Sequence, residues 1–302
     1  MSLLVVGSIA IDSVETPFGR AENVVGGAAT YFALAASFFA PVRMVAAVGD
    51  DFPAEVLDDL RTRGVDLAGV ERRAGRTLRW SGRYHEDMNV RDTLHLDLGV
   101  FADFQPRVPE RYRDSAYVFL ANIDPRLQAS VLEQLYAPGV VGCDTMNHWI
   151  AESRPDLERL LERVGILVIN DEEARLLSGE RNVVRAARRV LQMGPKTLLV
   201  KRGEYGVIQF SANSIFAVPA FPLEEVFDPT GAGDCFAGGF MGQLARSGDT
   251  SPAGLRRAIV YGSVMASFVV EDFSHRRLQG LTADMIEHRY RQFVSLTDID
   301  GG

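Results

Sequence analysis

The sequence predicts an α/β fold in which helices cover a mostly parallel central sheet and a small β-sheet is attached to it. Short apolar runs with the length of buried strands alternate with longer segments of helical periodicity, as in successive βαβ units. These runs lie at residues 3–7, 42–48, 117–121, 140–143, 165–169 and 197–200. Polar residues follow most of them, which marks the ligand-binding edge of such a sheet.

Composition limits the classes of function. The 302 residues, 47% of them hydrophobic, are enough for a large core, and a net charge of −8 argues against nucleic-acid or membrane-surface partners, which need a basic face. Cys143 and Cys235 are far apart in the sequence and lack the spacing of metal ligands, which is typical of a protein in a reducing compartment. The apolar segments are too short for a signal peptide or a membrane span. We therefore expect a soluble, cytoplasmic protein.

The first strand leads to Asp12, and a glycine pair precedes the first helix, which we expect to reach residue 39. A carboxylate at a strand end can accept two hydrogen bonds from a diol, or it can cap a turn. Gly26 and Gly27 permit a tight turn or the close approach of a ligand. After the second strand a helix runs to residue 61.

Two segments, at about 12–25 and 70–105, alternate without helical periodicity and predict a small antiparallel sheet. Five of their polar residues either contact a substrate or lie on the surface, and the surface is the simpler interpretation for most: Arg79, Tyr84, Asn89, Arg91 and His95.

Polar residues also follow the later strands. Asp144 and Asn147 come after 140–143, and Asn170 and Glu173 open a helix over 171–178. Spacing alone favours a capping box for that pair, whereas Glu173 could instead hold magnesium through water. Lys201 ends the strand at 197–200 and can reach a nucleotide phosphate or pair with Glu204.

The stretch Asp228-Pro229-Thr230-Gly231-Ala232-Gly233-Asp234 predicts a helix N-terminus. Glycines allow close approach to unsatisfied backbone N–H groups, so an anion should bind there, and Asp234 stands where it can accept a proton. The alternative is a glycine-rich turn that only starts a helix. Three glycines in the following helix, 235–246, predict close packing, and further helices are expected at 253–270 and 282–293.

This stretch closely resembles the DTTGAGD signature of the PfkB, or ribokinase-like, family of carbohydrate and nucleoside kinases, from which only Pro229 differs. Asp12, the glycine pair, Gly49-Asp50, residues 170–173 and the turn bounded by Gly203 and Gly206 follow in the family's order. The resemblance implies one ribokinase-like domain over 1–302, a three-layer α/β/α sandwich whose small sheet forms a lid and can clasp a homodimer. It also implies ATP, Mg²⁺ and a monovalent cation.

Residue by residue, the resemblance implies four groups. Asp234 is the base, with Gly231, Ala232 and Gly233 as the anion hole, and the acceptor, a sugar or nucleoside, lies against Asp12, Gly26, Gly27 and Asn147. Nucleotide contacts come from Asn170, Lys201, Gly203, Gly206 and Thr230, and magnesium from Glu173. Asn147 stands one place later than in the family's DxNxR segment, no arginine follows it, and Lys201 replaces a threonine.

Two other classes of function are alternatives to a sugar or nucleoside kinase. A non-catalytic nucleotide or metabolite sensor has no need of Asp234. A dinucleotide-dependent dehydrogenase would need a GxGxxG pattern, which Gly7-Ser8-Ile9-Ala10 does not provide.

Overall fold

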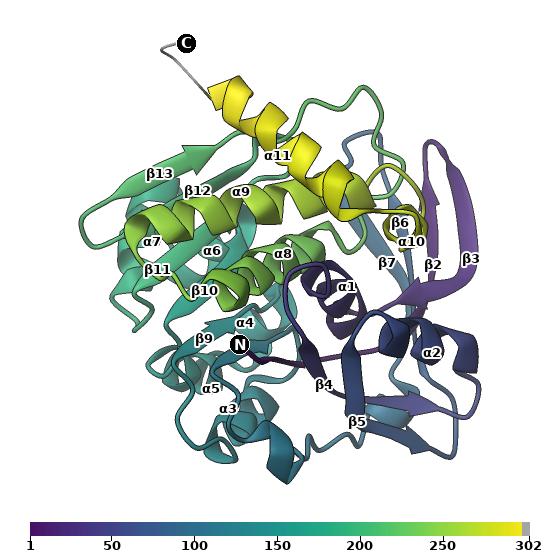
Figure 1. Cartoon of the computed structure of the whole chain (residues 1–302). Helices are drawn as coiled ribbons and strands as arrows, with labels where there is room; N and C mark the ends of the chain where they lie inside the picture. The colour runs from purple at the N-terminus through teal and green to yellow at the C-terminus, as the bar shows by residue number, and fades with distance from the viewer. Residues whose placement is uncertain (298–302) are drawn as a thin grey trace.

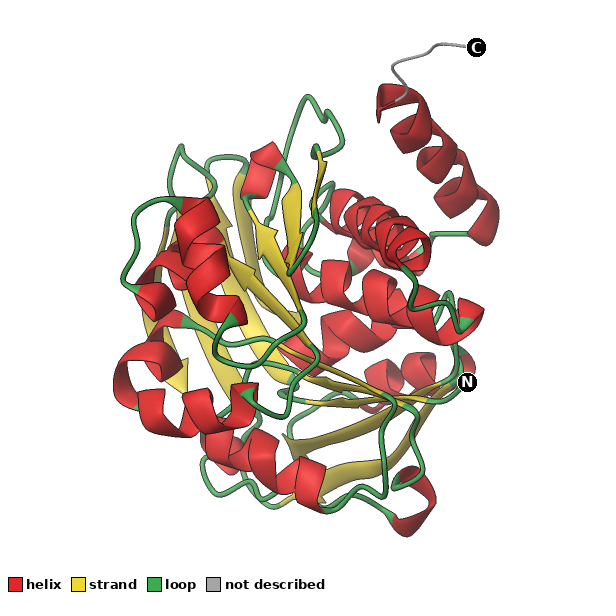
Figure 2. Ribbon diagram, turned by 90° about the vertical axis from the view of Figure 1, so that its left-hand side faces the viewer, coloured by secondary structure: helices red, strands yellow, loops and turns green. Residues whose placement is uncertain are grey.

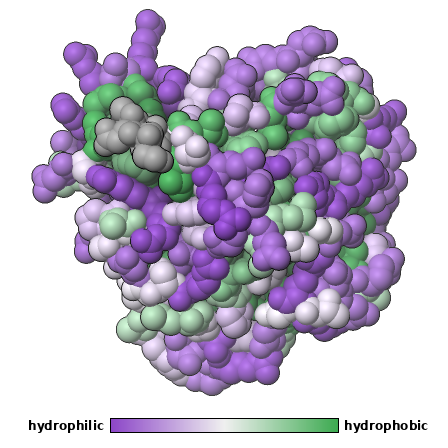
Figure 3. Space-filling view, turned by 45° about the horizontal axis from the view of Figure 1, so that its top comes forward, coloured by the Kyte–Doolittle hydropathy of each residue, from purple (hydrophilic) through white to green (hydrophobic). Residues whose placement is uncertain are grey.

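The computed structural model describes residues 1–297; residues 298–302, the end of the predicted domain, lie outside it. Helices cover both faces of a large sheet, and a smaller sheet lies beside it (Figures 1 and 2). Hydrophilic residues predominate on the face shown in Figure 3. Within residues 1–297 no helix combines the length and the apolar character needed to cross a bilayer.

The large sheet has nine strands in the order β13-β12-β11-β10-β9-β8-β1-β4-β5. Its strands are parallel from β11 to β5, whereas β12 and β13 add in antiparallel fashion. The six predicted strands are confirmed, and β5, β12 and β13 extend the sheet beyond them. The strands are β1 (Leu3–Val6), β4 (Val42–Gly49), β5 (Val65–Arg73), β8 (Tyr117–Leu120), β9 (Val140–Cys143), β10 (Ile166–Asn170), β11 (Thr197–Lys201), β12 (Val207–Ser211) and β13 (Ile215–Val218).

Two apolar cores, one on each face of this sheet, hold the helices in place. Alternate strand residues enter opposite cores, as Leu3 and Leu4 do in β1. One face carries α1 (Ala28–Ala36), α2 (Ala54–Thr62), α8 (Ala232–Ser247), α9 (Pro252–Val269), α10 (Arg276–Gln279) and α11 (Ala283–Thr297). The other carries α3 (Pro125–Glu133), α4 (Asn147–Glu152), α5 (Arg154–Leu161), α6 (Asp171–Ser178) and α7 (Val183–Leu191).

The glycines of α8 pack against both neighbouring helices, as predicted. A Cβ on Gly238 would lie 2.3 Å from the carbonyl oxygen of Phe32 in α1, and one on Gly239 would lie 2.7 Å from Cγ of Met265 in α9. Each glycine costs a helix up to about 1 kcal/mol relative to alanine, and the close packing offsets this cost. The helix is therefore held tightly between α1 and α9.

The small sheet has the order β3-β2-β6-β7 and consists of β2 (Ala10–Thr16), β3 (Gly19–Gly26), β6 (Leu78–Tyr84) and β7 (Arg91–Asp97). The expectation of a purely antiparallel sheet is wrong at its centre, because β2 and β6 run parallel. After β3 the chain passes through α1, β4, α2 and β5 before it returns as β6, so β2 and β6 are not joined by a hairpin and can pair in parallel. Residues 70–73, expected in the lid, belong to β5 of the large sheet.

Candidate functional site

The loop before α8 lies where residues of the two sheets meet, since Tyr84 of β6 contacts Thr230 and Lys201 of β11 lies beside Gly233; we call this region the cleft. Gly231 caps the helix with φ 79°, and the ring of Tyr31 lies 2.5 Å from the place of a Cβ, so only glycine fits. Asp228 braces the loop, because its two carboxylate oxygens accept hydrogen bonds from the backbone N–H groups of Thr230 and Ser274, each at 2.9 Å. The predicted helix start is confirmed, since α8 begins at Ala232.

The backbone N–H groups at this helix start differ in their partners. Ala232 donates its N–H to the carbonyl oxygen of Pro229 at 3.2 Å, and its place in the anion hole stays a prediction. Within the described part of the chain, the N–H groups of Gly233 and Asp234 have no such backbone partner. Anions are stabilised at this end of a helix by such groups and by the helix dipole.

Asp234 lies in the first turn of α8, partly exposed to the cleft. Burial raises the pKa of its carboxyl group, and the positive charges of Lys201 and Arg91 oppose that shift. The carboxylate is thus close to two cations that arrive from different sheets, because Lys201 ends β11 and Arg91 begins β7.

Lys201 reaches the anion-binding end of α8. Its Nζ lies 2.7 Å from the place of a Cβ on Gly233, and its charge opposes the effect of burial on the pKa of Asp144 and of Glu173. Among residues 1–297 it forms no ion pair with Glu204. Of the two interpretations left open by the sequence, the position of Nζ favours a phosphate contact.

Asn170 and Glu173 form a capping box at the start of α6. Glu173 Oε2 accepts from the N–H of Asn170, and Asn170 Oδ1 accepts from the N–H of Glu173, both at 2.7 Å. Asn170 pairs with Lys201 across β10 and β11, which places this helix start beside the cleft. Nowhere in residues 1–297 do three or more His, Cys, Asp or Glu residues form a metal-binding group.

Buried polar atoms without partners lie at the end of β9. Within residues 1–297, Asp144 Oδ1, Thr145 Oγ1 and Asn147 Oδ1 have no hydrogen-bond partner. Burial raises the pKa of Asp144 well above its ordinary value, and the charge of Asp234 adds to this effect. Unpaired buried acceptors are costly and are common where a ligand or water binds.

Asp12 lies inside β2, with its carboxylate packed against the glycine pair. A Cβ on Gly26 would lie 1.8 Å from Asp12 Oδ2, and one on Gly27, whose φ is 95°, would lie 2.6 Å from the carbonyl oxygen of Ser8. Burial, followed by the charges of Asp228 and Asp234, raises the pKa of Asp12 to about 7. The carboxylates of Asp12 and Asp234 are therefore close enough for their charges to interact.

Replacing Asp12 by asparagine should change how stability depends on pH. The folded-state pKa is about 7 and the ordinary value is 3.8, so the folded protein holds a proton that the unfolded chain loses, and stability falls as pH rises from 4 to 7. Each pKa unit is worth ~1.4 kcal/mol, so Asp12→Asn should raise the free energy of unfolding by several kcal/mol at pH 8 and much less at pH 4. Urea unfolding at both pH values measures this, with exposed Asp103→Asn as control; equal effects at both would contradict it.

Two residues of the small sheet approach the loop before α8: Tyr84 is buried there, and Arg91 stays exposed, although its charge acts on Asp12 and Asp234. The sequence favoured the surface for most of the polar residues in this sheet. Tyr84 and Arg91 are partners across β6 and β7, and Thr230 Oγ1 donates a hydrogen bond to the Tyr84 hydroxyl oxygen at 3.2 Å. Burial raises the pKa of Asp12 and of Glu173, and the positive charge of Arg91 opposes this shift in both. Arg79, in contrast, forms an ion pair with Asp51. The position of Arg91 beside Tyr84 follows from the pairing of β6 with β7, which the sequence pattern does not show.

The hairpin between β6 and β7 touches the turn after β11. Gly203 and Gly206 have φ values of 52° and 83°, which confirms the predicted tight turn. A Cβ on Gly203 would lie 1.8 Å from Asn89 Oδ1. The hairpin thus spans the cleft, from Thr230 at its base to Gly203 at its tip.

Gly203→Ala should displace the hairpin tip. Alanine in this left-handed conformation costs roughly 1–2 kcal/mol, and its methyl group would also collide with Asn89. We expect faster protease cleavage within residues 85–90 and weaker ATP binding. Gly179→Ala is the matched control, since φ there is 73° and no atom lies within 4 Å of the place of its Cβ. Equal cleavage of the two variants would show that the hairpin does not rest on Gly203.

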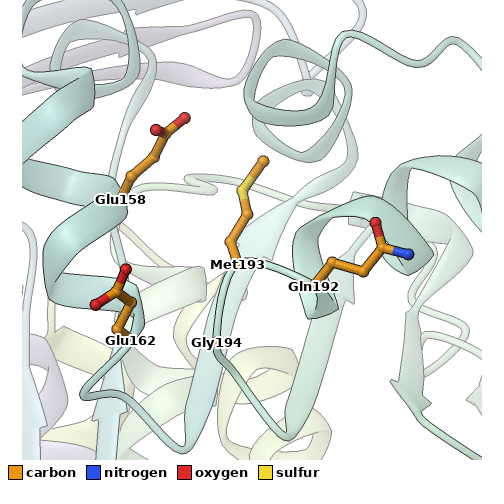
Figure 4. A pocket seen from close by; sticks show the side chains of 5 residues that line it. All are labelled: Glu158, Glu162, Gln192, Met193 and Gly194. Atoms are coloured by element: carbon orange, nitrogen blue, oxygen red, sulfur yellow. The ribbon is translucent and has the colours of Figure 1, made fainter.

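A pocket of about 310 Å³ between α5 and the end of α7 contains none of these residues (Figure 4). It is lined by Glu158, Glu162, Gln192, Met193 and Gly194. Its two carboxylates would repel a nucleotide, so the cleft remains the better candidate.

Comparison with known proteins gives a consistent result. Residues 2–278 match the model of the "pfkB family carbohydrate kinase". The chain is 34% identical over 251 residues to a cytidine kinase of Thermococcus kodakarensis, covering 82% of this chain and 89% of that protein. It is 28% identical over 285 residues to a nucleoside kinase of Methanothermobacter thermautotrophicus, covering 89% of each.

The fold is also that of solved structures. A putative ribokinase II of E. coli, in complex with ATP and Mg²⁺, has a TM-score of 0.75 at 22% identity, covering 98% of this chain and 99% of that one. With the family match over most of the chain, the fold is ribokinase-like. The chain therefore belongs to the pfkB family of carbohydrate kinases, which makes it an ATP-dependent kinase.

Proposed function

We propose that this protein transfers the γ-phosphoryl group of ATP to a hydroxyl group of a nucleoside or sugar, with Asp234 as the base. One observation carries the proposal: Asp234, the free N–H groups of Gly233 and Asp234, Lys201 and Asp12 converge on one cleft. An acceptor-binding carboxylate and an anion-binding helix start within reach of one base are what this reaction needs.

In the proposed reaction, Asp234 accepts the proton of the acceptor hydroxyl as its oxygen bonds to the γ-phosphorus. The bond from that phosphorus to the bridging oxygen breaks, and ADP leaves with the electron pair. The N–H groups at 233 and 234, with the Nζ of Lys201, stabilise the negative charge of the transferring group. No residue of the chain becomes covalently modified.

The nucleotide would lie along the ends of β10 and β11. Asn170, Lys201 and Thr230 would face its phosphates, and the turn from Gly203 to Gly206 would leave room for the rest of it. Bound magnesium neutralises phosphate charge, and the second oxygen of Glu173 would contact its water shell. The E. coli neighbour that contains ATP and Mg²⁺ supports the use of these two ligands. Comparing turnover in a potassium salt with turnover in a salt of a bulky organic cation tests whether the reaction needs the monovalent cation that the resemblance implies.

The proposal includes two classes of acceptor, sugars and nucleosides. Asp12, Gly26, Gly27 and Asn147 would bind a diol that sugars and nucleosides share, and the two relatives named for nucleosides favour a nucleoside. Labelled ATP with a panel of sugars and nucleosides tests both. Ligand binding without any phosphoryl transfer would instead support a sensor.

We also propose a homodimer through the lid. β7 is an edge strand and carries exposed Leu94 and Leu96, and an open edge of this kind pairs readily with a second copy. Sedimentation of the wild type and of Leu94→Lys tests this.

The buried free thiols of Cys143 and Cys235 fit a reducing cytosol, which we propose as the location.

A further inference from the structure

Trp80 lies beside Asp12 on the cleft side of the small sheet. The two residues are partners across β2 and β6, so their side chains project from the same face of neighbouring strands, which lie about 4.8 Å apart. Tyr84 projects from this face too, four residues along β6, and it meets Thr230. The face therefore points toward the anion-binding loop.

The indole ring of Trp80 is held in a fixed orientation. A Cβ on Gly82 would lie 2.2 Å from Cη2 of the ring, so the ring lies over this glycine. Its Nε1–H donates to Thr93 Oγ1 at 3.2 Å, and the Cζ of Arg91 is 5.5 Å from the ring centroid. A large aromatic surface is thus positioned in advance, with a cation at its side.

Core packing does not account for this residue. Trp80 is only partly buried, and it belongs to neither of the two apolar cores that hold the helices. A buried tryptophan usually lies within such a core. The ring therefore has surface available for a ligand.

The order of the side chains matches the shape of one class of acceptor. Asp12 is the partner of Trp80 across β2 and β6, and the charge of Asp234 is close enough to raise the pKa of Asp12. In a ribonucleoside the vicinal diol lies between the hydroxymethyl carbon and the carbon that carries the base. A nucleoside whose diol binds Asp12 can therefore present its hydroxymethyl group to Asp234 and its base to Trp80.

We propose that Trp80 stacks on the nucleobase of the acceptor and so selects nucleosides over free sugars. The inference rests on the proposed function for the placing of the diol at Asp12, but it concerns binding and can be tested without turnover. Stacking on an aromatic ring tolerates different bases. The contact would therefore select nucleosides as a class, and not one particular base.

Tryptophan fluorescence tests the contact directly, because Trp80 and Trp149 are the only tryptophans. In Trp149→Phe, the emission of Trp80 should change saturably with cytidine or inosine and should not change with D-ribose. In the converse variant, Trp80→Phe, the emission of Trp149 should not respond to either ligand. No change in Trp149→Phe at nucleoside concentrations that calorimetry shows to be saturating would overturn the proposal.

Calorimetry on further variants tests selectivity. Trp80→Ala should weaken nucleoside binding about ten-fold or more, because a stacked base is lost, and should leave ribose binding unchanged. Trp80→Phe keeps an aromatic ring and should bind nucleosides nearly as the wild type does, which guards against misfolding as the cause. Equal weakening for nucleoside and ribose in Trp80→Ala would overturn the proposal.

The two proposals fail in different ways. A wild-type protein that phosphorylates sugars but neither binds nor phosphorylates nucleosides would refute the role of Trp80 and leave the kinase intact. Nucleoside binding at Trp80 without phosphoryl transfer to any acceptor would support the contact and refute the proposed function.

Discussion

Asp234→Asn is expected to lower kcat by roughly 10²- to 10⁴-fold while ATP and the acceptor still bind, because the amide cannot accept the proton of the attacking hydroxyl. The substitution preserves the shape of the side chain at the start of α8, and the N–H groups of Gly233 and Asp234 remain. Steady-state kinetics and calorimetry of both ligands together measure this separation of turnover from binding.

The control for this experiment is Asp58→Asn, which removes an exposed carboxylate that pairs with Arg61 on α2. It should change neither kcat nor binding, because exposed ion pairs contribute little. If Asp234→Asn retained more than a tenth of wild-type kcat, another group would have to be the base.

Lys201→Met is expected to reduce kcat/KM for ATP at least ~100-fold, since it removes the cation at the anion-binding end of α8. The remaining carboxylates, Asp144, Glu173 and Asp234, would then face the phosphates with Arg91 as the nearby positive charge. Acceptor binding in the absence of ATP should be nearly unchanged. Lys201→Arg should recover part of the loss, because it restores the charge.

The chain supplies a matched control, because Lys196 is its only other lysine and is exposed. Lys196→Met should leave the kinetics as they are. A second readout is amine-directed labelling, in which ATP should protect Lys201 and leave Lys196 reactive. Equal protection of both lysines, or an unchanged kcat/KM in Lys201→Met, would contradict a phosphate contact.

The sequence predicted the centre of the fold better than its margins. Strands such as β1 and β10 are buried on both faces, so their continuous apolar runs identify them. β13 lies at an edge and alternates between exposed and covered residues, a weaker signal. The parallel pairing of β2 with β6 depends on a chain path through the other sheet, which local pattern does not record.

The candidate site was also predicted only in part. Asp12, Gly231 and Asp234 belong to motifs whose spacing is local, and the structure brings them to one cleft. Arg91 and Tyr84 reach it through β7 and β6, and alternation alone does not tell which side of a strand faces the cleft. The choice between phosphate and Glu204 for Lys201 required knowing that β11 ends beside α8.

The tight fit of α8 between α1 and α9 bears on how the cleft meets a highly charged ligand. Backbone and side-chain atoms of both neighbours fill the places where glycine Cβ atoms would be, so a shift of the helix toward either neighbour would cause a steric clash. We therefore expect the helix dipole to keep its orientation when the ligand binds. The field at the helix start is thus preorganised when the protein folds, and no solvent-like reorientation is needed at the moment of transfer.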